Sequence, residues 1–85
     1  MKYFVYVLVS LQNNDLYIGN TANIKSRLTL HNSGRVRSTK GYKPWKLLET
    51  REFASRGEAV RMERFLKDHQ QKEILKKKYG AMAKR

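Results

Sequence analysis

The sequence predicts a small α+β domain in which a short antiparallel β-sheet is flanked by helices. The N-terminal part has the composition and alternation of a β-hairpin, and the C-terminal part repeats apolar residues at helical spacing. With 85 residues the chain has room for one domain, and its 40% hydrophobic content is typical of a folded protein rather than a disordered tail. We expect a single domain over residues 1–80 and a short basic tail at 81–85.

Three strands are predicted. In residues 3–9 both alternating sets of side chains are apolar, which indicates a strand covered on its two faces. Turn formers fill residues 12–15, and an extended pattern resumes at 16–19, so residues 3–19 are expected to form a β-hairpin. Residues 45–53, from a tryptophan to a phenylalanine, fit a third strand.

The first helix is predicted over residues 22–32, directly after the hairpin. Ile24 and Leu28 are four residues apart and therefore form an apolar stripe on one side of it. Asn20 or Thr21 is expected to be the N-cap residue, because a short polar side chain there can accept a hydrogen bond from a free backbone amide.

Two more helices are predicted in the C-terminal third. The first, over residues 55–68, opens with Ser55-Arg56-Gly57-Glu58, which has the form of a capping box. The second covers residues 70–79, where lysine, glutamine and glutamate favour a helix, and Gly80 is expected to end it.

Charge and composition point to a nucleic-acid partner. Nineteen lysines and arginines against seven acids give a net charge of +12, which favours a polyanion such as DNA or RNA. The absence of cysteine excludes a disulfide framework and thiolate-bound metals, and makes the cytoplasm the default location. The longest apolar run, Phe4 to Val9, is too short to span a membrane. We expect a cytoplasmic protein, with a monomer favoured.

A basic loop separates the first helix from the third strand. Its cations alternate with serine, threonine, glycine and tyrosine, a mixture that can hold phosphates through charge, hydroxyls and backbone amides. A loop that only adds solubility is the alternative. Similarly, Lys76-Lys77-Lys78 fits either a binding surface or a solvated helix face. The cations of the basic loop are Arg35, Arg37, Lys40, Lys43 and Lys46.

Glu63 is the most unusual acid in the sequence. On a helical wheel it falls between Ala59 and Val60, on the apolar side of the helix over residues 55–68. A carboxylate facing a core needs a cation or hydrogen-bond donors to offset its desolvation. Two readings stay open, an internal salt bridge to an arginine and a metal ligand.

Four further side chains are candidates for chemistry. Arg27 and His31 are adjacent on the first helix and border its apolar stripe. The alternatives are a solvated surface charge for Arg27 and an ordinary helix C-terminal residue, favoured by the helix dipole, for His31. Tyr6 and Tyr17 lie on facing strands, and Tyr17 shares a face with Gly19, where a missing side chain lets a ligand or backbone approach closely. Simple packing is the alternative role for both tyrosines.

Taken in order, these residues resemble the motifs of the GIY-YIG nuclease family. The stretch from Tyr17-Ile18-Gly19 through Thr21 and Ile24 to Arg27, followed by His31-Asn32-x-Gly34, is similar to the central motif. Val5-Tyr6 is similar to the first motif, with Phe4 where the family has glycine. The segment from Ala59 through Glu63 to Lys67 resembles the helix that carries the metal-binding glutamate. Many members of the family also have an asparagine some residues after that glutamate, but in this chain no asparagine follows Asn32.

The resemblance runs through about residues 3–80. It is greatest to the small stand-alone bacterial branch, and extends to the nuclease domains of the excision-repair C subunit and of structure-specific junction endonucleases. It implies an α/β (α+β) sandwich built on a three-stranded antiparallel sheet, and a metal-dependent endonuclease acting on DNA in repair or recombination. RNA stays open as a substrate. The alternative is a non-catalytic nucleic-acid-binding module of the same fold.

The resemblance also implies roles for individual residues. Glu63 would hold one Mg²⁺ or Mn²⁺, a hard cation that accepts a single carboxylate and completes its shell with water and phosphate oxygens. The metal and Arg27 would stabilise the charge of the transition state. Tyr17 or Tyr6 would orient or deprotonate the attacking water, helped by His31. Lys67 and the basic loop would contact the nucleic acid.

Overall fold

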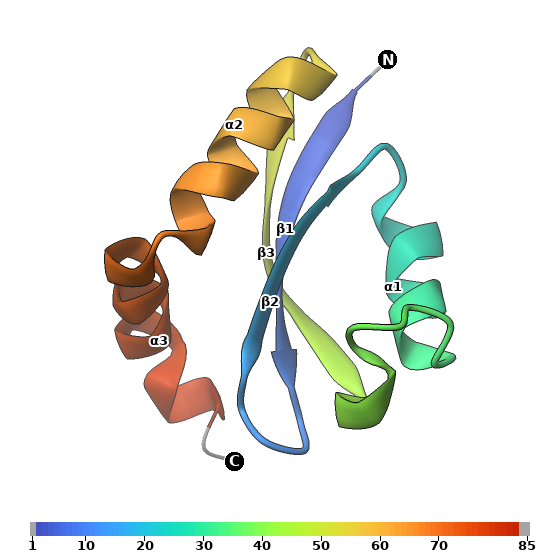
Figure 1. The fold of residues 1–85 in the computed structure, drawn as a ribbon, viewed down its shortest axis with the longest axis vertical. Helices are drawn as coiled ribbons and strands as arrows, with labels where there is room; N and C mark the ends of the chain where they lie inside the picture. Colours follow the sequence, from blue (N-terminus) through green and yellow to red (C-terminus); the bar gives the residue numbers. More distant parts are fainter. Residues whose placement is uncertain (1, 84–85) are drawn as a thin grey trace.

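A computed structural model describes residues 2–83 of the chain, and its centre is a three-stranded antiparallel sheet (Figure 1). The strands are β1 (Tyr3–Ser10), β2 (Leu16–Thr21) and β3 (Trp45–Phe53), arranged in the order β2-β1-β3. Because β1 lies between the other two and is covered on both faces, its two alternating sets of side chains are both apolar. The predicted fold class is confirmed.

The helices cover the two faces of the sheet unequally (Figure 1). α1 (Ile24–Asn32) and the short 3₁₀ helix η1 (Lys40–Tyr42) lie against one face. α2 (Arg56–Lys67) and α3 (His69–Ala83) lie against the other. The capping box at the start of α2 is present as predicted, with the Ser55 hydroxyl accepting from the Glu58 amide.

The N-cap predicted for the first helix is wrong. α1 begins at Ile24, and the side chain of Asn23 accepts a hydrogen bond from the Ser26 amide at 2.9 Å. Asn20 and Thr21 belong instead to β2, which stays paired with β1 as far as Thr21. Pairing of β2 along its whole length therefore delays the start of the helix.

The end of the last helix also differs from the prediction. α3 continues through Gly80 to Ala83, because a glycine costs a helix only about 1 kcal/mol relative to alanine and does not by itself end it. Residues 81–83 of the predicted basic tail are thus helical, and residues 84 and 85 lie outside the described part of the chain. The division into a domain at 1–80 and a tail stays a prediction.

Each face of the sheet has its own hydrophobic cluster. On the side of α2 and α3, Val5, Val7 and Val9 of β1 pack with Ala59 and with residues of the other elements. The remaining buried members of that cluster are Leu16, Ile18, Leu66 and Leu75. On the side of α1 the buried residues are Tyr6, Leu8 and Trp45, joined by the partly buried Tyr17, Ile24, Leu28 and Leu47. The polar candidates for chemistry lie mainly on this second face.

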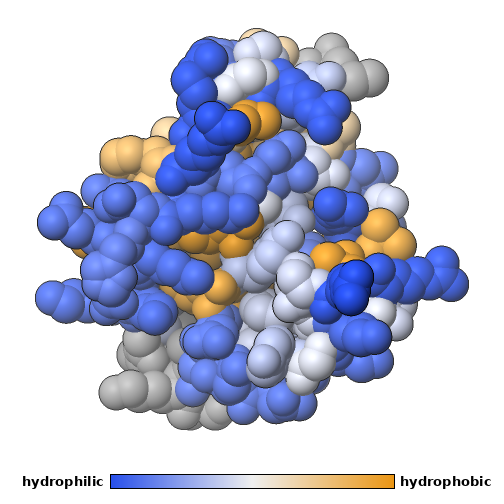
Figure 2. Space-filling view, in the orientation of Figure 1, coloured by the Kyte–Doolittle hydropathy of each residue, from blue (hydrophilic) through white to orange (hydrophobic). Residues whose placement is uncertain are grey.

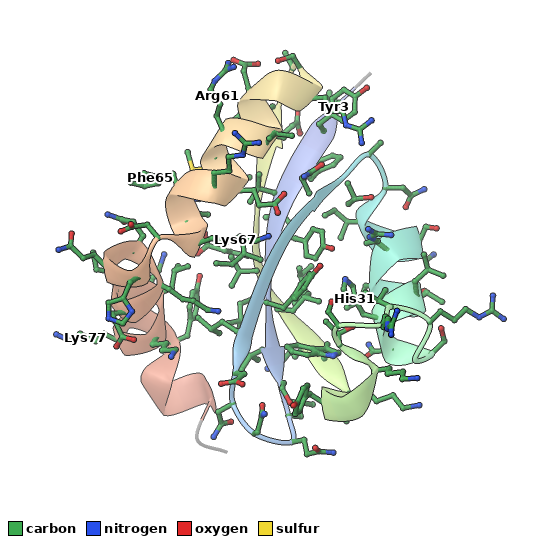
Figure 3. The ribbon with its side chains drawn as sticks, in the orientation of Figure 1. Tyr3, His31, Arg61, Phe65, Lys67 and Lys77 are labelled. Carbon is green, nitrogen blue, oxygen red and sulfur yellow. The ribbon has the colours of Figure 1, made fainter. Side chains whose placement is uncertain are left out.

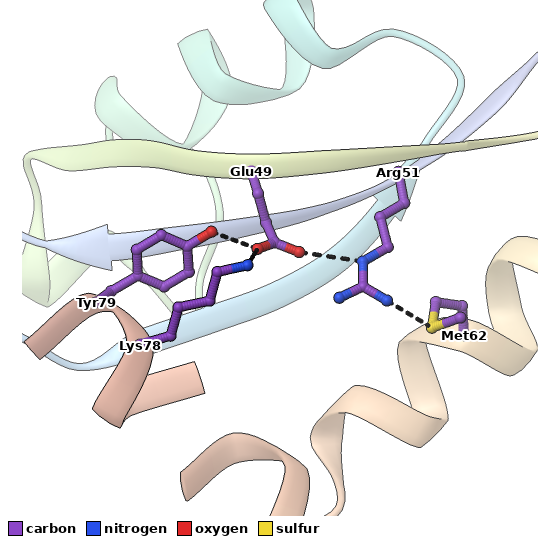
Figure 4. A network of polar contacts seen from close by, with 5 residues as sticks. All are labelled: Glu49, Arg51, Met62, Lys78 and Tyr79. Atoms are coloured by element: carbon purple, nitrogen blue, oxygen red, sulfur yellow. Dashed lines mark hydrogen bonds and ion pairs between the residues drawn. The ribbon is translucent and has the colours of Figure 1, made fainter. Parts of the chain in front are cut away.

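A polar network ties α3 to the sheet (Figure 4). The carboxylate of Glu49 on β3 accepts hydrogen bonds from the Tyr79 hydroxyl and from Arg51 Nε at 3.1 Å, and Lys78 Nζ lies 3.4 Å away. Arg51 also reaches Met62 on α2. Burial alone would raise the pKa of Glu49, but the contacts with Tyr79, Arg51 and Lys78 lower it below its ordinary value. Glu49 therefore stays ionised in the folded protein near neutral pH.

Hydrophilic side chains cover most of the molecular face shown in Figure 2, with only small apolar areas between them. This agrees with the net charge of +12. Among residues 2–83, no helix has the length and apolar character needed to cross a membrane.

Candidate active site

A hydrogen-bonded chain lies buried between β1, α1 and the basic loop. The Tyr6 hydroxyl is 2.9 Å from Nε2 of His31, and Nδ1 of His31 is 2.8 Å from the Thr39 hydroxyl. His31 and Thr39 are completely buried, and Tyr6 is only 2% exposed. The structure therefore joins two residues predicted for the site with Thr39, which the sequence did not single out.

The partners of Thr39 determine how the protons are arranged. The Thr39 hydroxyl donates to the Val36 carbonyl oxygen at 3.3 Å, so its oxygen is left to accept Nδ1–H of His31. Nε2 of His31 then carries no proton and accepts the hydrogen bond of Tyr6. Burial lowers the pKa of His31, and the positive charge of Arg27 lowers it further, which keeps the imidazole neutral.

Gly19 makes room for the Tyr6 side chain. Gly19 faces Tyr6 across the β1–β2 pair, and a Cβ at position 19 would lie 2.6 Å from the Tyr6 hydroxyl oxygen and 2.8 Å from its ring carbon Cζ. It would also lie 3.2 Å from the ring of Tyr17. A close approach at this glycine was predicted, but it is made by Tyr6 rather than by a ligand or another backbone.

Tyr17 and Arg27 complete this group. The ring of Tyr17 packs edge-on against His31, with centroids 4.8 Å apart, and lies 6.2 Å from the ring of Tyr6. Burial raises the pKa of Tyr6 to about 12, an effect that Arg27 opposes and that Tyr17 and Glu63 reinforce. The other four residues predicted as catalytic thus each interact with Tyr6 in the folded protein.

Glu63 approaches the group around the edge strand β2. Its carboxylate is 17% exposed and accepts a hydrogen bond from the Asn20 side-chain amide. The other carboxylate oxygen lies 2.6 Å from Nζ of Lys67, one helical turn further along α2. The predicted need for a partner is confirmed, but the partners are Lys67 and Asn20 rather than an arginine. Lys67 lies between α2 and β2 in Figure 3.

The alternation of side chains along β2 could have indicated that Asn20 faces α2. Side chains alternate between the faces of a strand, so Asn20 must point away from Gly19 and toward α2. No comparable signal marked Thr39, because its contact with His31 depends on the path of the loop.

The basic loop is anchored at several points although its cations are exposed. Trp45 Nε1 donates to the Thr39 carbonyl oxygen, the Asn32 side chain binds the backbone of Trp45, and the Ser10 hydroxyl donates to the Tyr42 carbonyl oxygen. A cis peptide bond precedes Pro44. The five predicted cations lie outside the buried group and face solvent, although Lys46 belongs to β3 and not to the loop.

Comparison with known proteins places this geometry in a family. The family model described as the GIY-YIG catalytic domain matches residues 2–79. The chain belongs to the GIY-YIG family. Membership in this nuclease family implies a nucleic-acid substrate.

Several relatives carry only a family label in their names. A UPF0213 protein of Staphylococcus haemolyticus is 36% identical over 76 residues, which cover 88% of this chain and 92% of that protein. A UPF0213 protein of Nitratidesulfovibrio vulgaris is 47% identical over 62 residues, covering 72% of this chain and 56% of that protein. The solution NMR structure of a UPF0213 protein from Bacillus halodurans shares 33% identity and a TM-score of 0.54, covering 88% of this chain and 82% of that one.

Replacing Gly19 by alanine should destabilise the domain. The new methyl group would overlap the Tyr6 ring, so the free energy of unfolding should fall by about 1–3 kcal/mol in a urea titration. Gly41→Ala is the matched control, because nothing lies within 4 Å of a Cβ at that position. Equal stability of the two variants would show that Tyr6 does not occupy this space.

The buried His31 should make stability depend on pH. In the folded protein the pKa of His31 lies below its ordinary value of 6.5, so around and below that pH the unfolded chain binds more protons at this residue than the folded chain does. The free energy of unfolding should therefore be highest above about pH 6.5 and decline as the pH falls below it. His31→Gln should make this decline shallower, whereas the exposed His69→Gln should leave it unchanged. Identical slopes in urea titrations of all three proteins would contradict a neutral buried His31.

Proposed function

We propose that the chain is a metal-dependent endonuclease that hydrolyses phosphodiester bonds in DNA, with a role in repair or recombination. The observation that supports this most directly is the Tyr6 hydroxyl, which is hydrogen-bonded to a neutral His31 and lies under the influence of Arg27 and Glu63. A phenol with a proton acceptor behind it and charged groups beside it suits proton transfer from water.

Tyr6 is the better candidate for the base. A phenol with a pKa of about 12 is a poor base if it must first ionise on its own. Its proton, however, already points at Nε2 of His31. When the attacking water gives a proton to the Tyr6 oxygen, Tyr6 can pass its own proton to His31, and the Thr39 hydroxyl accepts from the resulting imidazolium.

Tyr17 has a different role in this proposal. Its hydroxyl has no proton acceptor behind it among the described residues, and its side chain is only partly buried. It can therefore donate a hydrogen bond to the attacking water or to a phosphate oxygen. Arg27 supplies a guanidinium that can pair with the charge that develops on the phosphate.

The carboxylate of Glu63 is a suitable ligand for a hard divalent cation. Carboxylate oxygens are among the ligands that Mg²⁺ and Mn²⁺ prefer, and Glu63 offers them, while the Asn20 amide nitrogen donates a hydrogen bond to the same carboxylate. Among residues 2–83 no cluster of three or more His, Cys, Asp or Glu side chains could hold an ion, so water and phosphate oxygens would have to complete the shell. When bound, the metal would act as a Lewis acid on the phosphate.

One observation favours a binding module of the same fold. Lys67 can neutralise Glu63 from within the chain, because its Nζ lies 2.6 Å from Oε2 of Glu63. The Lys67 side chain is half exposed, so it is free to turn toward a phosphate when a cation takes its place on Glu63. Activity assays separate a resting enzyme from a module that has lost turnover.

Glu63→Gln should abolish nicking of plasmid DNA. Loss of the carboxylate removes the anchor for the metal, so the rate with Mg²⁺ or Mn²⁺ should fall by at least about a hundredfold, to the level seen in EDTA. Binding of the same DNA should persist. Glu73→Gln, an exposed carboxylate on α3 that pairs with Lys76, is the control and should cleave normally. Metal-independent nicking, or binding without nicking by the unaltered protein, would contradict the proposal.

The two tyrosines should differ in how much each contributes to the rate of cleavage. Tyr6→Phe removes the group that passes the proton and should lower the rate by about a hundredfold or more at every pH. Tyr17→Phe removes only an orienting hydroxyl and should keep the pH profile of the original protein at a reduced rate. Rates measured across neutral pH check this, and the reverse order of effects would assign the base to Tyr17.

A further inference from the structure

An open pocket of about 300 Å³ lies next to the buried group, at the end of the sheet where β1 begins and β2 ends. The turn after β2, the first helix and the start of α2 complete its walls. Six residues line the pocket: Tyr3, Asn20, Thr21, Ala22, Arg27 and Arg56. Arg56 is the first residue of α2 and directly follows the N-cap residue Ser55.

The pocket has the chemistry of an anion site. Two of its six lining residues are arginines and none is acidic. Neither guanidinium forms an ion pair with a carboxylate of residues 2–83, although five of the chain's seven acids lie on strand β3 and helices α2 and α3. The Arg27 Nε–H is buried and lacks a hydrogen-bond partner within the described chain. Two guanidiniums without a carboxylate partner are well suited to phosphate oxygens.

The pocket is also connected to the candidate active site on two sides. Arg27 belongs to both, because it lines the pocket and acts on Tyr6. Asn20 belongs to both as well, because its amide binds Glu63. A nucleic-acid strand that presents one phosphate to Tyr6 and Glu63 would therefore run past the pocket with a neighbouring phosphate.

We propose that this pocket binds the phosphate next to the scissile one, with Arg56 as a substrate-positioning residue. This inference rests on the proposed nuclease function and adds to it a second phosphate contact outside the reacting group. Arg27 spans the two phosphate positions, while Arg56 serves the pocket alone.

Binding in EDTA, where no cleavage occurs, tests the proposal through the salt dependence of affinity for a labelled oligonucleotide. Arg56→Gln should weaken binding by about tenfold at low salt and reduce the slope of log affinity against log salt by about 0.7–0.9, the loss of one phosphate contact. Arg56→Lys keeps the charge and should retain the slope. Arg61→Gln is the matched control, because Arg61 lies on the same helix but points away from the sheet (Figure 3) and does not line the pocket.

Neutral methylphosphonate linkages locate the contact. One such linkage next to the cleavage site should weaken binding by the unaltered protein and by Arg61→Gln, but should cause no further loss in Arg56→Gln. Equal effects of Arg56→Gln and Arg61→Gln, or additive losses from Arg56→Gln and the linkage, would overturn the proposal. The nuclease function would survive that result if the unaltered protein still nicked DNA. Absence of nicking with an intact Arg56 effect would overturn the nuclease function and the position next to a scissile phosphate, and would leave Arg56 as a phosphate contact.

Discussion

The site depends on a single neutral imidazole buried where three parts of the chain meet. His31 comes from α1, its Nε2 accepts from Tyr6 on β1, and its Nδ1 donates to Thr39 in the basic loop. A polar group buried without partners would cost about 1–3 kcal/mol, so both contacts must form for the fold to be stable. The same two hydrogen bonds therefore hold the loop on the sheet and set the proton positions at Tyr6.

The second constraint is the position of β2 at the edge of the sheet. Gly19 faces α1 and leaves space for Tyr6, while the next residue, Asn20, faces α2 and holds Glu63. Neighbouring residues of one strand point to opposite faces, so an interior strand would have separated these groups by a layer of sheet. Because β2 has a free edge, groups from both faces can converge around it.

Much of the fold could be predicted from the sequence, because it follows from local patterns. The double apolar alternation of β1, the capping box at Ser55 and the inward position of Glu63 all depend on residues close in the chain. What could not be predicted depends on distant contacts. Thr39 reaches His31 only because of the loop's path, and the contact of Asn20 with Glu63 depends on how α2 packs on the sheet, although strand alternation directs Asn20 toward α2. The ion pair of Glu63 with Lys67 is local, because the two residues are one helical turn apart. The pocket at Arg56 is formed by four segments that are separate in the sequence, so no spacing of residues in the sequence predicts it.

The central place of β1 in the sheet has a consequence for synthesis on the ribosome. β1 emerges first and can pair with β2 almost at once, but its other edge has no partner until β3 has been translated as far as Phe53. At about 5–20 residues per second this interval lasts a few seconds, during which a hydrophobic strand edge is open on the nascent chain. Leu75, which completes the core on the α2 and α3 side, arrives later still. During this interval the unpaired edge of β1 can form hydrogen bonds with strands of other nascent chains.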